Sequence, residues 1–278
     1  MEKERMDFTD YTDSICPFCT DQFKKQPPVR PIPTQRVLEK LDEHLGRNDY
    51  DSAERHLLYW LDEAKDGRDK HGMLTVENEL MGLYRKTNRK ENALESVRKA
   101  LDLIDELKLG SAVVAGTTFT NAATVYKAFA MPEESIELFE KAKEIYEKEL
   151  QSDDQRLGGL YNNLGLTLTD LKRFDEAEEY YNKAINVMSD NKNGELEIAI
   201  TYLNLCDLNE AKLGSEQSEK IIDEYIEKAY ELLNRDYLPR NGYYAFVCEK
   251  CAPTFGYFGR FLYQKELSDR ARCIYERN

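Results

Sequence analysis

Hydrophobic residues recur along this chain with helical spacing, and the resulting pattern returns about every 41 residues. In the clearest copy, one face of a first helix carries Tyr161, Leu164, Gly165 and Leu168. One face of a second helix carries Ala177, Tyr181 and Ala184. Residues 170–173 between them suffice only for a turn. Small residues let two helix axes approach within about 8–10 Å, so the pattern predicts an antiparallel helical hairpin.

The same hairpin pattern appears in other parts of the chain. Its first-helix positions include Leu41, Leu80, Phe119, Tyr202 and Phe255. Glycines punctuate several joints between the predicted helices, at Gly110, Gly194, Gly214 and Gly242. No stretch shows sustained alternation with period two, so no sheet is expected. The sequence therefore predicts an all-α fold of about six antiparallel hairpins that stack as one α-solenoid domain.

These residues resemble the tetratricopeptide repeat (TPR) family, in which an aromatic residue and Leu-Gly on the first helix face Ala, an aromatic residue and Ala on the second. The resemblance covers about residues 34–278, which we assign to the repeat domain. The steps from Ala53 to Ala93, Ser135 and Ala177 are 40, 42 and 42 residues, longer than the common repeat of about 34. This period is similar to the extended subtype of kinesin light chains and of peptide-sensing regulators from Gram-positive bacteria. The resemblance implies a right-handed superhelix.

Residues 1–33 do not follow the repeat and form a predicted N-terminal arm. The run from Pro27 to Pro33 favours an extended linker, because proline lacks an amide proton and has a fixed φ. Aromatic and aliphatic residues precede it at Phe8, Tyr11, Ile15, Phe18 and Phe23. Three roles are open for the arm: a cap on a terminal repeat, a segment that folds into the chain's own groove, or a self-association element.

Charge and hydropathy narrow the class of partner. The net charge is −14, and no basic stripe is present, which argues against nucleic acid. The longest weakly polar stretch, residues 111–115, is too short to span a bilayer, and the first residues lack the apolar core of a signal peptide. We therefore expect a cytoplasmic protein with no membrane partner, and the six cysteines suit a reducing compartment.

Two Cys-x-x-Cys pairs stand out, Cys16 with Cys19 in the arm and Cys248 with Cys251 in the last helical region. Four thiolates could hold a structural zinc ion in a tetrahedron. That arrangement requires the arm to reach the C-terminal repeats, since the pairs are far apart in the sequence. Packing thiols are the alternative, because cysteine behaves as a small buried hydrophobe. The first pair also resembles thioredoxin-like active sites, but no strand pattern surrounds it.

No catalytic motif is apparent. The three histidines have no nucleophile or carboxylate at a diagnostic spacing, and neither a P-loop nor a Gly-x-Ser-x-Gly string occurs. Acidic composition accounts for the many paired carboxylates. We expect a protein that is not an enzyme and that needs no cofactor, structural zinc aside.

The family resemblance places ligands on the concave face, which the first helix of each hairpin lines. The candidate groove residues are Asn78, Asn121, Thr124, Lys127, Asn162, Asn163, Asn204, Asp207, Tyr257 and Arg260. Asn121, Asn163 and Asn204 are equivalent positions in successive repeats. Their amides could pair with the backbone of an extended peptide, or could bond one hairpin to the next. Few inner cations accompany them, so a clamp for a C-terminal carboxylate is not favoured.

The C-terminal region is rich in aromatic residues, from Tyr237 to Tyr263. Part of this set must pack the last hairpin. The remainder could form a homodimer contact or lie under the arm. We interpret the chain as a non-catalytic scaffold that binds a protein or peptide segment. The alternatives are a regulator that responds to a signalling peptide, and a scaffold stabilised by zinc.

Overall fold

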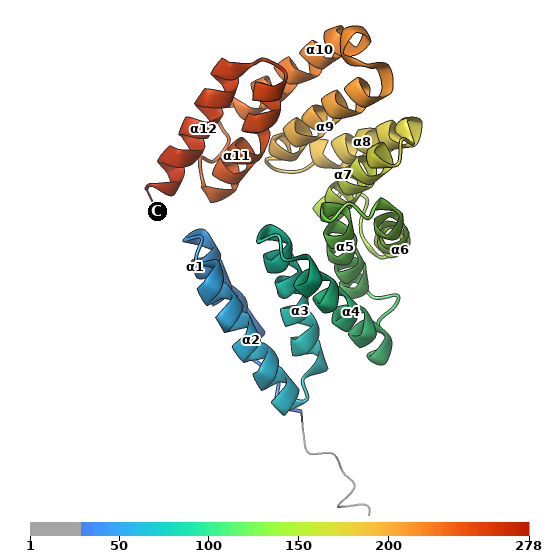
Figure 1. The fold of residues 1–278 in the computed structure, drawn as a ribbon, viewed down its shortest axis with the longest axis vertical. Coiled ribbons are helices and arrows are strands. Elements are labelled where there is room, and N and C mark those ends of the chain that lie inside the picture. Colours follow the sequence, from blue (N-terminus) through green and yellow to red (C-terminus); the bar gives the residue numbers. More distant parts are fainter. Residues whose placement is uncertain (1–28, 278) are drawn as a thin grey trace, which may run out of the picture.

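The structure, a computed structural model, describes residues 29–277 and forms twelve α-helices and no strand over that range (Figure 1). The helices are α1 (Thr34–Gly46), α2 (Tyr50–Gly67), α3 (Lys70–Lys86), α4 (Lys90–Glu106), α5 (Val113–Ala128), α6 (Pro132–Glu149), α7 (Gln155–Asp170), α8 (Phe174–Ser189), α9 (Glu195–Leu213), α10 (Ser215–Leu233), α11 (Gly242–Tyr257) and α12 (Phe261–Tyr275). Each odd-numbered helix packs against the even-numbered helix that follows it. The prediction of six stacked hairpins is confirmed.

The turns within the hairpins repeat with the same period as the helices. Asn48, Asn88, Ala130 and Lys172 occupy equivalent turn positions, and each has a positive φ between 54° and 58°. Successive members of this set are 40, 42 and 42 residues apart, which equals the spacing of the second-helix alanines. The α9–α10 turn differs, since Gly214 takes a φ of 80° there. Backbone geometry therefore follows the sequence period in the first four hairpins.

The hairpin of α7 and α8 shows why a small residue recurs on the first helix. Gly165 faces the ring of Tyr181, and a Cβ on Gly165 would lie 2.6 Å from Tyr181 Cε1. Tyr181 is completely buried, as is Ala177 on the same helix. The absence of a side chain at Gly165 therefore creates the space that the tyrosine fills.

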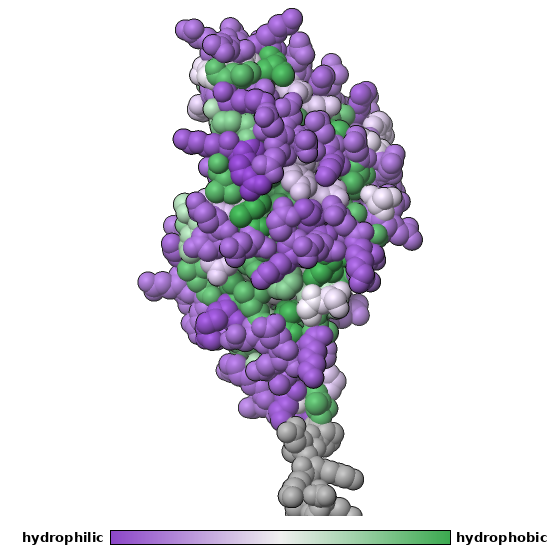
Figure 2. Space-filling view, turned by 90° about the vertical axis from the view of Figure 1, so that its right-hand side faces the viewer, coloured by the Kyte–Doolittle hydropathy of each residue, from purple (hydrophilic) through white to green (hydrophobic). Residues whose placement is uncertain are grey.

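The helices follow a curve, and the odd-numbered helices form its inner side (Figure 1). From α3 to α11, each odd-numbered helix contacts the next odd-numbered helix directly, whereas the even-numbered helices are spread apart. The outer side, on the right in Figure 1, is mostly hydrophilic with small hydrophobic patches (Figure 2). The curve brings the first and last hairpins near each other, and Tyr50, Lys86, Phe246 and Tyr275 help to line a cavity of about 740 Å³ between them.

The last residues of the predicted arm pack on the first repeats. Arg30 donates its backbone N–H to the Gly67 carbonyl at 2.9 Å, and Ile32 donates to the Asp69 carboxylate at 2.9 Å. Residues 1–28, with Cys16 and Cys19, lie outside the described residues, so the three roles open for the arm stay predictions. None of the helices in the described part of the chain is long and apolar enough to cross a membrane.

Candidate peptide-binding groove

The residues predicted for the groove lie on the inner helices. Asn78 is on α3; Asn121, Thr124 and Lys127 are on α5; Asn162 and Asn163 are on α7; Asn204 and Asp207 are on α9; and Tyr257 is on α11. Arg260 is in the turn between α11 and α12. The fold therefore collects residues from five helices along one curved inner wall.

Two asparagine pairs join neighbouring inner helices. Asn121 donates its amide N–H to Asn78 Oδ1 at 2.9 Å, which links α5 to α3. Asn204 donates in the same way to Asn162 Oδ1 at 3.0 Å, which links α9 to α7. Bonding between hairpins, one of the two roles considered for these residues, is therefore present. The partner of Asn204 is Asn162 and not its neighbour Asn163.

The third member of the predicted ladder bonds within its own helix. Asn163 donates its amide N–H to the Gly159 carbonyl at 3.0 Å. Asn121, Asn163 and Asn204 are all half-buried. In each case the amide nitrogen has a partner, whereas the amide oxygen accepts no hydrogen bond from another residue in the 29–277 range. The three oxygens, on α5, α7 and α9, therefore have no hydrogen-bond donor within that range.

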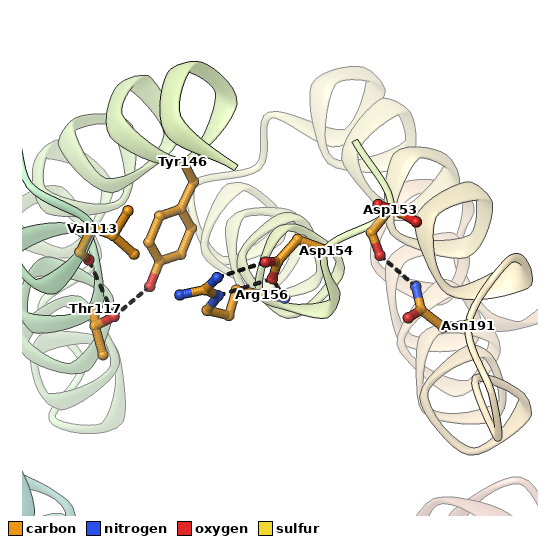
Figure 3. Close-up of polar contacts among 7 residues, drawn as sticks. All are labelled: Val113, Thr117, Tyr146, Asp153, Asp154, Arg156 and Asn191. Carbon is orange, nitrogen blue, oxygen red and sulfur yellow. Dashed lines mark hydrogen bonds and ion pairs between the residues drawn. The ribbon is translucent and has the colours of Figure 1, made fainter. Parts of the chain in front are cut away.

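The hydroxyl groups of the inner threonines of α5 already have hydrogen-bond partners within the chain. Thr124 donates to the Thr120 carbonyl at 2.5 Å, and Thr120 donates to the Gly116 carbonyl at 2.9 Å. Thr117 lies 2.9 Å from the Tyr146 hydroxyl (Figure 3). These hydroxyls satisfy their own helices, as threonine commonly does inside a helix.

The joint between α5 and α7 contains a cation that sequence reasoning missed. Arg156 points toward Tyr146, with its guanidinium carbon 6.0 Å from the ring centroid (Figure 3). The same guanidinium forms an ion pair with Asp154 at 2.6 Å. That ion pair raises the pKa of Arg156 and lowers the pKa of Asp154. The Asp154 side chain also caps α7.

The inner cations predicted from the sequence are mostly neutralised by partners. Lys127 pairs with Asp170 at 3.4 Å, and Arg260 pairs with Asp223 at 2.7 Å. Arg85 on α3, a third inner cation, makes no ion pair with residues 29–277, and partial desolvation of its guanidinium lowers its pKa. A clamp built from several free cations is therefore not formed by these residues.

Carboxylates on the same inner wall have fewer oppositely charged partners than the cations do. Asp207 is exposed and has no hydrogen bond or ion pair with any residue between 29 and 277. Partial desolvation of its carboxylate by neighbouring atoms, together with the charge of Glu210, raises its pKa to about 6. Burial likewise raises the pKa of Glu79 on α3 and of Glu197 on α9. The overall acidity of the sequence concealed which carboxylates face inward.

The aromatic residues of the last hairpin divide into two groups. Tyr244 and Phe255 are fully buried in the core of α11 and α12. Tyr243, Phe246 and Tyr257 remain on the surface of α11, with exposed fractions of 47%, 48% and 70%. Homodimer contact through this region stays a prediction.

Cys248 and Cys251 lie on the buried face of α11, exposed by 0% and 2% respectively. Burial raises the pKa of both thiols, that of Cys251 to about 12. Within residues 29–277, no three His, Cys, Asp or Glu side chains are grouped to hold a metal ion. Because Cys16 and Cys19 are outside that range, the four-cysteine zinc hypothesis stays a prediction.

Comparison with known proteins agrees with the overall fold. Residues 160–191, which span most of α7 and α8, match the tetratricopeptide repeat family. Two Podosopora anserina structures, described as kinesin light chain nearly identical TPR-like repeats and a point variant of them, give TM-scores of 0.52 and 0.53 at 15% identity. In both cases 73% of this chain and 95% of the other are covered. BtubC (BKLC) from P. vanneervenii gives 0.48 at 17% identity, with 89% and 92% covered. No curated protein matches by sequence.

The fold is an α-solenoid of helical hairpins, similar to the TPR-like repeats of the two Podosopora anserina structures. The α7–α8 hairpin contains the match to the tetratricopeptide repeat family, over residues 160–191, and the hairpins on both sides of it repeat its packing. The assignment to the extended subtype stays a prediction.

Proposed function

We propose that this chain is a non-catalytic scaffold that binds an extended peptide or partner segment along its concave face. This proposal rests mainly on the amide oxygens of Asn121, Asn163 and Asn204, which accept no hydrogen bond within the described chain. An extended segment has backbone N–H groups without regular partners, and these are the donors such oxygens accept.

The spacing of the row supports an extended ligand. The three asparagines lie on consecutive inner helices that contact each other directly. Helices in contact are about 8–10 Å apart, and an extended chain advances about 3.3 Å per residue. Roughly every third residue of a bound segment would therefore meet one of the amides. A helix, which advances about 1.5 Å per residue, would match the row less well.

The nitrogen and oxygen of each amide have separate roles under this proposal. The nitrogen bonds of Asn121 and Asn204 fix the side chains against α3 and α7, so their oxygens are held in place before a ligand arrives. A pre-ordered acceptor loses little entropy on binding. Scaffold bonding and ligand binding, which were competing interpretations of the sequence, are compatible at these positions.

The test begins with peptides selected from a random display library on the immobilised full chain. Calorimetry then compares wild type with Asn163→Ala, a change that removes no bond between helices. We expect at least fivefold weaker binding and an unchanged unfolding midpoint. The control is Asn182→Ala on the exposed surface of α8, which should bind as wild type does. Equal affinities for all three proteins would disprove the groove proposal.

A further inference from the structure

Three exposed aromatic rings lie on one face of α11, and one of them, Phe246, lines the cavity between the first and last hairpins. Tyr243, Phe246 and Tyr257 are spaced for a single helix face, and they are 47–70% exposed. The rings of Tyr243 and Phe246 stack with their centroids 6.3 Å apart. Large exposed rings on an inner helix form a surface that a partner can cover.

The tyrosines of this surface are tied to carboxylates on the neighbouring inner helix. Tyr257 donates its hydroxyl to Glu210 at 2.9 Å, and Tyr243 donates to Glu197. Tyr237, in the loop before α11, donates to Glu195 at 2.5 Å. These bonds fix the ring orientations and place negative charge beside each ring. We call the α11 rings and their α9 carboxylates, with Asp207, the aromatic–acidic face.

One end of this face carries uncompensated negative charge. Asp207 and Glu210 lie three residues apart on α9, and therefore on the same side of that helix. Neither makes an ion pair with residues 29–277, although Glu210 accepts hydrogen bonds from the hydroxyls of Ser215 and Tyr257, each at 2.9 Å. The inner cations that could offset them are engaged elsewhere, Lys127 with Asp170 and Arg260 with Asp223. Lys250 lies near Glu197, at the other end of the face.

We infer that the aromatic–acidic face receives a basic stretch of the bound segment, with an arginine or lysine side chain placed between Asp207, Glu210 and Tyr257. This inference rests on the groove function proposed above and adds the charge of the partner. A guanidinium or ammonium group gains charge-assisted hydrogen bonds from the carboxylates. It also gains a cation–π contact with the exposed tyrosine ring. The net charge of −14 attracts a basic segment and repels an acidic one.

The experiment uses capped, fluorescein-labelled nonapeptides with a Gly-Ser background and arginine at every third position. Matched peptides carry glutamine or glutamate in place of arginine. Fluorescence anisotropy with the full chain should give at least tenfold tighter binding for the arginine peptide than for the glutamine peptide, and no binding for the glutamate peptide. The affinity for the arginine peptide should fall as salt is raised, because partly exposed charges are screened.

Variants locate the binding on the chain. The double change Asp207→Asn with Glu210→Gln should weaken binding of the arginine peptide at least tenfold, and Tyr257→Ala at least threefold. Asp207→Asn alone breaks no internal hydrogen bond, so it tests the site even if the double variant is less stable. The control, Glu216→Gln with Glu219→Gln, changes the net charge equally on the exposed outer helix α10. It should stay within twofold of wild type.

Two results would overturn the inference, and they have different consequences for the groove function proposed above. An equal loss in the α10 control would show that net charge, and no particular face, attracts the peptide. Equal binding of the arginine and glutamine peptides, with both weakened by Asn163→Ala, would retain the groove function and remove the preference for a basic segment. Failure of the groove function itself would appear as insensitivity to Asn163→Ala.

Discussion

Asn204 on α9 donates its amide N–H to the amide oxygen of Asn162 on α7, at a distance of 3.0 Å. The same contact joins Asn121 to Asn78 two hairpins earlier, at 2.9 Å. These pairs stabilise the inner wall by connecting helices about 42 residues apart in the sequence. They also set the direction in which the remaining amide oxygens point.

The first prediction separates two adjacent asparagines. Asn162 is buried and accepts bonds from Asn204 and from Thr201, so Asn162→Ala should lower the free energy of unfolding by about 1–2 kcal/mol. Asn163→Ala should cost less than about 0.5 kcal/mol, because its bond is to its own helix. Urea unfolding measures both. Equal losses would mean that the inter-helix pair contributes no more to stability than the bond that Asn163 makes within its own helix.

A second prediction concerns two glycines on α7. Gly165→Ala forces a Cβ to within 2.6 Å of the buried Tyr181 ring, so we expect a loss of about 1–3 kcal/mol in unfolding free energy. Gly159→Ala meets nothing within 4 Å and should gain about 0.5–1 kcal/mol, because alanine favours a helix. Thermal and urea unfolding should give opposite signs. A gain for both variants would show that Tyr181 moves aside at no cost.

The third prediction is a pH dependence. The pKa of Asp207 is about 6 in the folded chain against 3.8 for the free side chain, so the folded state binds more protons between these values. Its contribution to stability therefore rises as the pH falls from 7 toward 4. Asp207→Asn should stabilise the fold at pH 7 by about 1 kcal/mol or less, given the exposure of the group. The gain should vanish near pH 4.

The matched control for this titration is Asp236→Asn, an exposed aspartate in the loop after α10. Unfolding curves of the three proteins at pH 4, 5, 6 and 7 provide the comparison. If Asp207→Asn raised the free energy of unfolding by the same amount at every pH in this range, Asp207 would not be the group that titrates, and the assignment of the raised pKa to Asp207 would be wrong.

A fourth prediction addresses the cysteines. Cys206, Cys248 and Cys251 are buried, whereas Cys273 is exposed. Only the thiolate reacts with iodoacetamide, and burial raises the pKa of the three buried thiols. Alkylation of the native chain should therefore label Cys273 at least a hundredfold faster. Mass spectrometry of individual peptides separates the sites, and urea should abolish the difference. Rapid native labelling of Cys251 would show that α11 opens readily.

Much of the fold could be predicted from particular residues. The face of Tyr161, Leu164, Gly165 and Leu168, and the partner face of Ala177, Tyr181 and Ala184, gave the correct hairpin. Helical periodicity is local, because residues three and four apart lie on the same side whatever the rest of the chain does. The steps of 40 and 42 residues then placed the other hairpins.

The side-chain contacts of the inner wall were predicted only in part. The asparagines were placed on inner helices correctly, but the pairing of Asn204 with Asn162 was not foreseen. Arg156, Glu79, Glu197 and Glu210 were missed, since an acidic helical sequence supplies many equivalent charges. Which of them face one another depends on the stacking of helices from different hairpins.

The sequence by itself determined the helices, their pairing into hairpins and the period of the stack, because these follow from contacts between near neighbours in the chain. Only the tertiary structure decided which amide oxygens are left without a donor, which inner cations are neutralised and where carboxylates lie beside open aromatic rings. Those properties depend on side chains about 40 residues apart, whose distances are set by the curvature of the whole solenoid.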